Sequence, residues 1–204
     1  MCIRDRSMGH HLQRNINAGQ LFGLENIYDH YLSEGAADRM CAYLKERWEK
    51  PGSRYHVMKE MFACLHKLEV LSADWPKKVR HYEKVLFGGG RKQYEALHQY
   101  RMPDKIAEQL LSYFIYVYFA GAVYDGMPYS KVKLAVISTM LIEDMVCAKA
   151  AEKGQLSFEA IADAAHSYAR EVEHSDLNLQ RLSIMFRHQK CFHIGRLCGA
   201  LLEW

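Results

Sequence analysis

The sequence predicts an all-α fold, an irregular multi-helix bundle with buried central helices around residues 104–123 and 130–153. Three observations support this prediction. Apolar residues recur three and four positions apart along most of the 204 residues, and almost no stretch alternates as a β-strand would. The 4 prolines and 13 glycines fall between the helical stretches. Half of the residues are apolar and a quarter are charged, as in ordinary globular domains.

The chain is expected to form one domain. Residues 1–6, MCIRDR, match nothing that follows in pattern and look like translated sequencing adapter, so we exclude them as not native. Residues 7–204 are long enough for a single all-helical domain with its own core. The adapter-like start predicts that this domain is the C-terminal portion of a longer protein.

The first helices follow from apolar spacing and from helix breakers. Residues 24–49 carry a helical pattern that SEGA, at 33–36, interrupts. The next helix is expected from about Tyr55 to Val70. Asp74 then caps a shorter helix in which Pro76 sits early, where a missing amide costs nothing.

Three glycines at 88–90 precede another helix and invite comparison with a phosphate-binding loop. A dinucleotide-binding loop needs GxGxxG after a buried strand, and a P-loop ends in Gly-Lys-Ser or Gly-Lys-Thr. Neither pattern is present, so a plain turn between two helices is predicted.

The central helices are bounded by clear signals. Pro103 is expected to open a helix that runs to about Val123. Ser130 is a suitable N-cap and Gly154 a suitable stop for a helix of about 23 residues, and Ser157 begins the next helix. The most hydrophobic windows in these helices are shorter than the roughly 20 residues that a bilayer-spanning helix needs, so no membrane insertion is expected.

Charge and cysteine content narrow the functional class. The net charge of +3 is spread along the chain with no basic block of five residues, which argues against nucleic-acid binding. The 6 cysteines are scattered, with no CxxC motif and no secretory signal ahead of them. Reduced thiols and a cytoplasmic location are therefore expected.

The sequence predicts no metal site in this chain. Two Glu-x-x-His pairs occur, Glu95 with His98 and Glu171 with His174. Such pairs supply half of a carboxylate-bridged di-iron site, but further glutamates would be needed, for example Glu60 and Glu143, and nothing selects these two. Surface or capping roles are the simpler interpretation.

The C-terminal segment HQKCFHIGRLC carries four residues of zinc-ligand type: His188, Cys191, His193 and Cys198. Their spacing matches no established zinc pattern, and positions i and i+2 of a helix point apart. An amphipathic helix lined by cysteine and leucine is predicted instead.

The string YAREVEHSDLNLQRL, residues 168–182, is the most concentrated polar cluster in the sequence. If Ser175 caps a new helix, the cluster is a polar joint between two helices. The apolar stripe, however, continues in register through Leu179, Leu182 and Phe186, as it would in one continuous helix. The two interpretations predict different neighbours for the polar side chains.

A continuous helix divides the cluster into three sets. One column follows one edge of the apolar stripe and holds Tyr168, Glu171, Ser175 and Asn178. Asp176 lies on the other edge, and Arg170 and His174 lie on the opposite side. Polar groups that border a buried face must be paired, and they are common where a cleft opens on the core.

Three segments together resemble the C-terminal helical part of the flagellin lysine-N-methylase family of bacteria. They are LEVLSADWP at 68–76, YFAGAVYDGMPYSKVKLAVIST at 118–139, and YAREVEHSDLNLQRL. They occur in the order of the family with similar separations, so the resemblance covers roughly residues 55–188. One departure is Ala169, where the family often has serine.

The resemblance implies an enzyme that moves methyl groups from S-adenosylmethionine to lysine side chains of flagellin. It implies catalytic roles for Glu171, Asp176 and Tyr168, because carboxylates can steer a lysine and receive its proton and a phenol can orient the amine. It implies substrate or cofactor binding by Arg170, His174, Ser175, Asn178, Tyr124 and Asp125. An iron–sulfur cluster or another metal belongs, by resemblance, to an N-terminal cysteine-rich segment that this chain lacks.

Other functions stay open at this point. The chain could be a non-catalytic helical module that recognises flagellin while an N-terminal part carries the chemistry. A di-iron carboxylate protein is the third hypothesis. The sequence does not define the oligomeric state.

Overall fold

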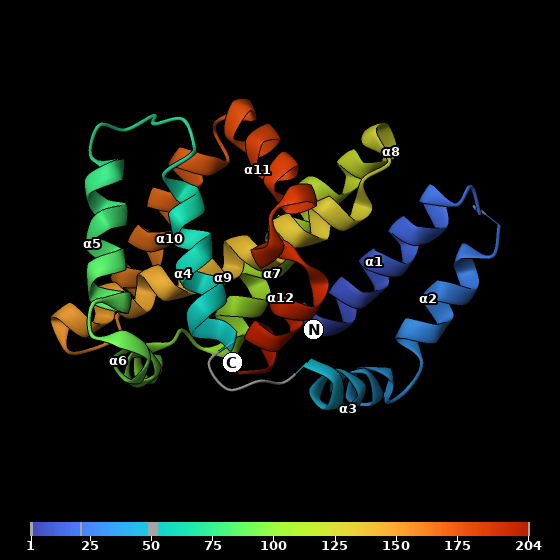
Figure 1. The fold of residues 1–204 in the computed structure, drawn as a ribbon, viewed down its shortest axis with the longest axis horizontal. Helices are drawn as coiled ribbons and strands as arrows, with labels where there is room; N and C mark the ends of the chain where they lie inside the picture. The colour runs from blue at the N-terminus through green and yellow to red at the C-terminus, as the bar shows by residue number, and fades with distance from the viewer. Residues whose placement is uncertain (1, 21, 49–52, 204) are drawn as a thin grey trace.

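The computed structural model describes residues 2–20, 22–48 and 53–203, which form helices and the turns between them (Figure 1). The predicted all-α fold is confirmed, because no strand occurs in these described residues. The α-helices are α1 Cys2–Asn17, α2 Leu24–Leu32, α3 Ala36–Trp48, α4 Ser53–Leu65, α5 Trp75–Phe87, α6 Gly90–Leu97, α7 Asp104–Tyr118, α8 Ala122–Asp125, α9 Pro128–Lys153, α10 Phe158–Val172, α11 Asp176–His188 and α12 Ile194–Leu202. Three short 3-10 helices are η1 His98–Tyr100, η2 Phe119–Gly121 and η3 Lys190–Phe192.

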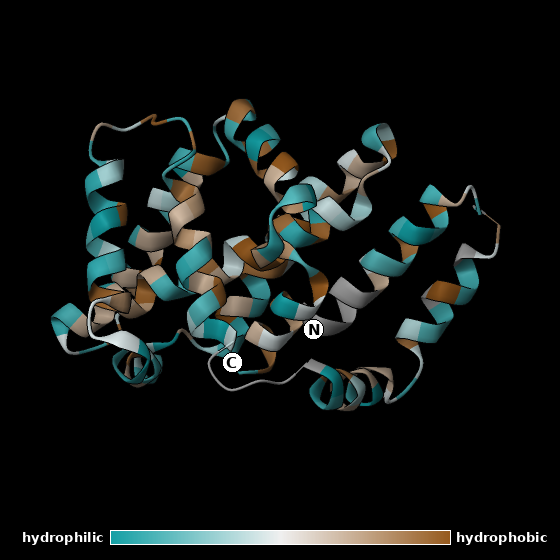
Figure 2. Cartoon of the chain, in the orientation of Figure 1, coloured by the Kyte–Doolittle hydropathy of each residue, from teal (hydrophilic) through white to brown (hydrophobic). Residues whose placement is uncertain are grey.

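Helix α9 is the central element of the bundle. It contacts α1, α4, α5, α6, α7, α10 and α11, and residues 132–148 are all buried. A helix enclosed on every side needs apolar residues all round rather than one stripe. Figure 2 shows the brown, hydrophobic residues gathered in this middle part of the molecule. The predicted burial of the 130–153 helix is confirmed.

Helix α7 is less buried than the sequence suggested. It packs against α9, but its buried side chains are only Leu111 and Phe114. Tyr116 is 88% exposed, and Tyr124 in α8 is 93% exposed. The expectation of a buried helix over 104–123 therefore holds for one face alone, because the described part of the chain covers the inner side of α7 and leaves its outer side open. By length and composition Asp104–Asp125 could cross a membrane, and only 11% of its apolar window is buried inside the fold.

Helix ends agree with the turn signals in most places. Gly154 adopts the left-handed conformation, at φ 70°, and stops α9, and the Ser157 side chain accepts a hydrogen bond from the Ala160 N–H at 3.2 Å. Gly90 is also left-handed, so the three glycines form the predicted turn. Ser130, however, does not cap α9. The helix begins two residues earlier at Pro128, whose fixed φ suits the first helical position.

The segment between α4 and α5 is a loop where more helix was expected. Helix α4 ends at Leu65, five residues before Val70. The loop 66–74 then crosses to α5, and Leu68 alone of its apolar side chains turns into the core. The N–H groups of Lys67 and Leu68 donate back to carbonyls of α4, but those of Glu69, Leu71 and Ser72 need other partners. Those partners come from the α10–α11 region.

Candidate functional site

The 168–182 string is a joint between two helices. Helix α10 ends at Val172 and α11 begins at Asp176, so the continuous-helix interpretation is wrong and the capping interpretation is correct. Ser175 has extended backbone, at φ −127° and ψ 107°, and its Oγ accepts the N–H of Asn178 at 3.1 Å. A serine in this conformation satisfies a free amide of the new helix, which outweighs the continuity of the apolar stripe.

Two buried side chains of this region hold the loop 66–74. Glu171 is 1% exposed, and its Oε2 accepts the backbone N–H groups of Leu71 at 3.0 Å and Ser72 at 3.2 Å. Asn178 is fully buried, and its Oδ1 accepts the Glu69 N–H at 2.6 Å. The Asn178 Nδ2 donates to the carbonyls of Glu69 at 2.9 Å and Glu171 at 2.7 Å. We call residues 168–178 together with the loop 66–74 the helix joint.

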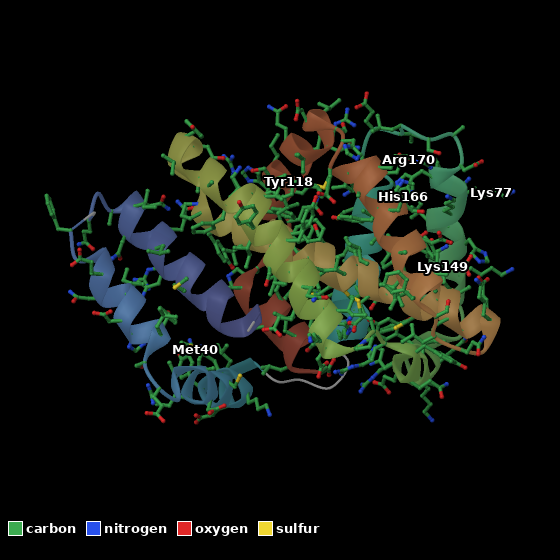
Figure 3. The ribbon with its side chains drawn as sticks, turned by 180° about the vertical axis from the view of Figure 1, so that it is seen from behind. Met40, Lys77, Tyr118, Lys149, His166 and Arg170 are labelled. Carbon is green, nitrogen blue, oxygen red and sulfur yellow. The ribbon has the colours of Figure 1, made fainter. Side chains whose placement is uncertain are left out.

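Two further contacts close the helix joint. Ser175 Oγ donates to Glu69 Oε2 at 3.1 Å, and Arg170 Nη2 donates to Ser72 Oγ at 3.0 Å. Figure 3 shows Arg170 at the end of α10, beside the loop that leads into α5. Two of the three segments that carry the family resemblance, 68–76 and 168–182, therefore meet in space.

The remaining predicted residues lie in different environments. Tyr168 is fully buried, its hydroxyl shares a 2.8 Å hydrogen bond with Ser138 Oγ, and burial raises its pKa. His174 and Asp176 are exposed. Tyr124 and Asp125 belong to α8, where Asp125 Oδ2 pairs with Lys131 Nζ at 2.7 Å at the start of α9.

The structure thus gathers Glu171, Ser175, Asn178 and Arg170, but it gathers them around a loop of the same chain. Most of their polar atoms are directed at the backbone of that loop and at one another, while Glu171 Oε1 is buried without a hydrogen bond from the described residues, 3.8 Å from Arg170 Nε. Direct roles for these residues in methyl transfer stay predictions.

Glu173, which directly follows α10, has partners on α7. Its Oε2 accepts hydrogen bonds from the hydroxyls of Tyr113 and Tyr118, both at 3.0 Å. Partial burial and the neighbouring carboxylate raise the pKa of Tyr118, so its hydroxyl stays a donor. Figure 3 shows Tyr118 near the middle of the molecule. These bonds tie the end of α10 to α7.

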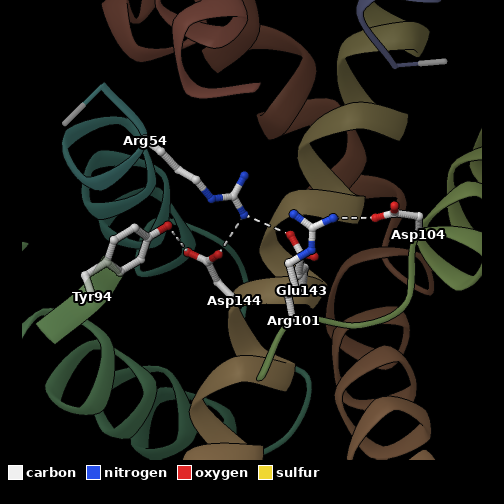
Figure 4. A network of polar contacts seen from close by, with 6 residues as sticks. All are labelled: Arg54, Tyr94, Arg101, Asp104, Glu143 and Asp144. Carbon is white, nitrogen blue, oxygen red and sulfur yellow. Dashed lines mark hydrogen bonds and ion pairs between the residues drawn. The ribbon is translucent and has the colours of Figure 1, made fainter. Parts of the chain in front are cut away.

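A second polar cluster surrounds Arg54 in the first turn of α4 (Figure 4). Arg54 is 2% exposed, and its Nη2 donates to Glu143 Oε2 at 3.0 Å and Asp144 Oδ1 at 2.9 Å. The Tyr94 hydroxyl of α6 donates to the other oxygen of Asp144 at 2.8 Å. Burial alone would lower the pKa of Arg54, but its contacts with Tyr94, Asp144 and Glu143 raise it. The cation is therefore held firmly in its charged form.

A pocket of about 250 Å³ adjoins this cluster, and we call it the Arg54 pocket. Its lining consists of Arg54, Tyr55, Tyr94, Glu95, His98 and Glu203. The His98 ring meets the edge of the Tyr94 ring at 4.9 Å between centroids, and its buried Nε2 has no hydrogen-bond partner among the described residues. Burial, followed by the charge of Arg54, lowers the pKa of His98, so the imidazole is neutral at pH 7.

Sequence reasoning did not find the Arg54 pocket as a unit. Glu143, Glu95 and His98 were considered only as metal ligands, and the structure places Glu143 against Arg54 instead. Glu60 forms an ion pair with Arg196. Among the described residues no group of three or more His, Cys, Asp or Glu side chains could hold a metal ion. The available signal was the adjacent acidic pair at 143–144 inside the most buried helix, because buried charges require a partner.

A larger pocket of about 420 Å³ lies beside α9 and the segment between α11 and α12. Its lining includes Tyr129, Lys133, Arg187 and Lys190. Lys133 is buried, and its Nζ donates to the Phe186 carbonyl at 2.7 Å and lies 4.4 Å from the Tyr129 ring centroid. This positive lining suits a carboxylate and opposes a sulfonium, so it fits only one end of S-adenosylmethionine.

The comparisons with known proteins define the class of the chain. A family model for a lysine N-methylase domain matches residues 7–200, which is nearly the whole chain. The chain belongs to the FliB lysine N-methylase family and corresponds to its C-terminal domain. The predicted resemblance is confirmed. No curated protein and no solved structure matches the chain.

Proposed function

We propose that this chain takes part in the transfer of methyl groups from S-adenosylmethionine to lysine side chains of flagellin. The observation that carries the proposal is the family match over residues 7–200, with its printed description as a FliB lysine N-methylase domain. The meeting of the 68–76 and 168–182 segments in one hydrogen-bonded joint supports it, because these segments carry the resemblance and depend on each other structurally.

The chemistry sets what such a protein must provide. A lysine attacks the methyl carbon as a neutral amine, so the site must remove a proton from its ammonium and hold the nitrogen in line with the methyl group. When bound, the donor supplies the electrophilic methyl group. In the Arg54 pocket, the residues that can hold or accept a proton are His98, Glu95 and Glu203.

A second candidate function is a substrate-binding module without catalysis of its own. The favouring observation is the exposed outer side of α7 and α8, where Tyr116, Val123 and Tyr124 are each more than four-fifths exposed. Apolar surface of this kind is typical of sites that bind other proteins. In this case the chain binds flagellin and does not bind the methyl donor.

One experiment tests the proposal and separates the two candidates. The purified chain is incubated with flagellin and S-adenosylmethionine labelled in its methyl group, and methylated lysines are identified by mass spectrometry. We expect labelled lysines in flagellin and none when flagellin is replaced by an unrelated helical protein. Flagellin binding in calorimetry without any methyl transfer or donor binding would support the module, and neither binding nor transfer would reject both candidates.

A further inference from the structure

The Arg54 pocket has the chemical character of a site for a cation. The rings of Tyr55 and Tyr94 lie 5.6 Å apart between centroids in an edge-to-face arrangement, and both line the pocket. The carboxylates of Glu95 and Glu203 line the same space. Tyrosine ring faces and carboxylates both attract a positive charge. An apolar stem that ends in a cation would suit this combination.

Arg54 does not make the pocket positive. Its guanidinium is bound by two buried carboxylates, Glu143 and Asp144, which leave this group of three with a net negative charge. Glu203 adds another negative charge, and its Oε2 accepts the backbone N–H of Arg54 at 2.7 Å. Glu95 forms an ion pair with Arg91, at 2.6 Å between Oε1 and Nε. The sum of these charges is negative.

The His98 side chain lines the same pocket. Its Nε2 is buried without a hydrogen-bond partner among the described residues. The charged groups that act on this ring are Arg54, Arg101, Asp144 and Glu95. A neutral imidazole nitrogen accepts a hydrogen bond from an ammonium N–H, whereas an imidazolium would repel it.

One lysine ammonium of the chain lies near the Tyr55 ring, although Lys59 does not line the pocket. Lys59 Nζ, one helical turn after Tyr55 in α4, lies 6.0 Å from the centroid of the Tyr55 ring. This is the distance range of a cation–π contact. The Tyr55 ring therefore already has one cationic neighbour within this chain.

We infer that the Arg54 pocket binds an alkylammonium group, with the carboxylates of Glu95 and Glu203 facing the ammonium and the ring of Tyr55 along its stem. The identification of this group as the side chain of a substrate lysine rests on the proposed function. The binding of an alkylammonium group does not rest on it.

The test uses the purified full chain and Nα-acetyl-lysine methylamide as the probe. Amide chemical shifts are followed by NMR while the probe is added, and Nα-acetyl-norleucine methylamide, which lacks the ammonium, is the matched control. We expect shifts that saturate for the lysine probe, centred on residues 54–55 and 94–98, and no saturation for the norleucine probe. Equal binding of both probes, or shifts elsewhere, would overturn the inference.

Charge variants test in the same titration whether the pocket carboxylates contribute to probe binding. Glu95→Gln and Glu203→Gln keep the shape and hydrogen-bonding oxygen of each side chain, and each should weaken probe binding about threefold. Arg91→Gln frees the Glu95 carboxylate and should strengthen binding by a similar factor. Glu108→Gln, on exposed surface of α7, is the control and should leave binding unchanged. Unchanged affinity in all three pocket variants would overturn the inference.

The inference and the proposed function fail in different ways. If the probe binds and the variants lower its affinity while flagellin is not methylated, alkylammonium binding by the pocket is supported and the proposed function is rejected. The opposite outcome is that flagellin is methylated, but Glu95→Gln and Glu203→Gln change neither the KM for flagellin nor the affinity for the probe. This result supports the proposed function and rejects the pocket assignment.

Discussion

The helix joint and the Arg54 pocket are both built from polar side chains that join segments far apart in the sequence. They differ in their surroundings, because one encloses a loop of the chain and the other adjoins open space. In the joint, Glu171 and Asn178 are directed at backbone groups of the loop 66–74. Around Arg54, buried charges adjoin an open pocket that Tyr55, Glu95 and His98 line. A dense polar string in a sequence can thus stabilise a fold, while a site that can bind a ligand is assembled from scattered residues.

The largest effect is expected where buried charges lose their partner. Arg54→Met leaves Glu143 and Asp144 buried without the guanidinium, and we expect a loss of about 3–5 kcal/mol in the free energy of unfolding. Urea denaturation followed by circular dichroism measures it. The triple variant Arg54→Met/Glu143→Gln/Asp144→Asn should regain a large part of this loss. A triple variant no more stable than Arg54→Met would contradict a charge-pairing role for Arg54.

A smaller loss is expected in the helix joint. Asn178→Ala removes three hydrogen bonds to the loop 66–74 and to the end of α10, and about 2–3 kcal/mol of stability should be lost. Asp176→Asn, two residues away and exposed, is the matched control and should cost less than about 1 kcal/mol. Equal stability of both variants would contradict the claim that the buried residues of the string stabilise the fold more than the exposed ones do.

The catalytic prediction for the same string can be tested beside its structural role. Glu171→Gln keeps an oxygen for the Leu71 and Ser72 amides but removes the charge, so the fold should persist with a loss of about 1 kcal/mol. A catalytic role of Glu171 predicts that the folded variant loses methyl transfer, whereas a purely structural role predicts that transfer falls by no more than the folded fraction falls. Complete loss of transfer at wild-type stability would give Glu171 a direct role in catalysis.

The smallest effect is a dependence of stability on pH at His98. The pKa of His98 is lowered in the folded state, so its contribution to stability is present above the unfolded pKa of about 6.5 and is lost as the pH falls below it. When the pH is lowered from 7.5 to 5.5, the urea midpoint of the wild type should therefore fall further than that of His98→Gln. Identical shifts in the two proteins would show that the imidazole is not held neutral by its surroundings.

Part of this architecture could be predicted from the sequence because it depends on neighbours along the chain. The stop at Gly154 and the caps at Ser157 and Ser175 are local, and the structure shows all three. The column of Tyr168, Glu171, Ser175 and Asn178 is indeed buried, although it runs over two helices. The loop that this column contacts could not be predicted, because the amides that donate to Glu171 lie about 100 residues away in the sequence.

The exposure of α7 and the Arg54 cluster could not be predicted for a related reason. The apolar residues of 110–124 indicate burial, but only the packing of other helices decides which face is covered, and Tyr116 stays outside. Arg54 precedes Glu143 by 89 residues, and no spacing rule connects them. The acidic pair at 143–144 signalled that some cation must reach α9, without indicating which one.

Amide hydrogen exchange in the loop 66–74 tests most directly the claim that the 168–178 string is a structural joint. The N–H groups of Glu69, Leu71 and Ser72 are donated to Asn178 and Glu171, whereas Val70 and Ala73 lie exposed between and beside them. Slow exchange at the three bonded amides and fast exchange at the two neighbours is the predicted result. Equally fast exchange at all five amides would contradict the joint.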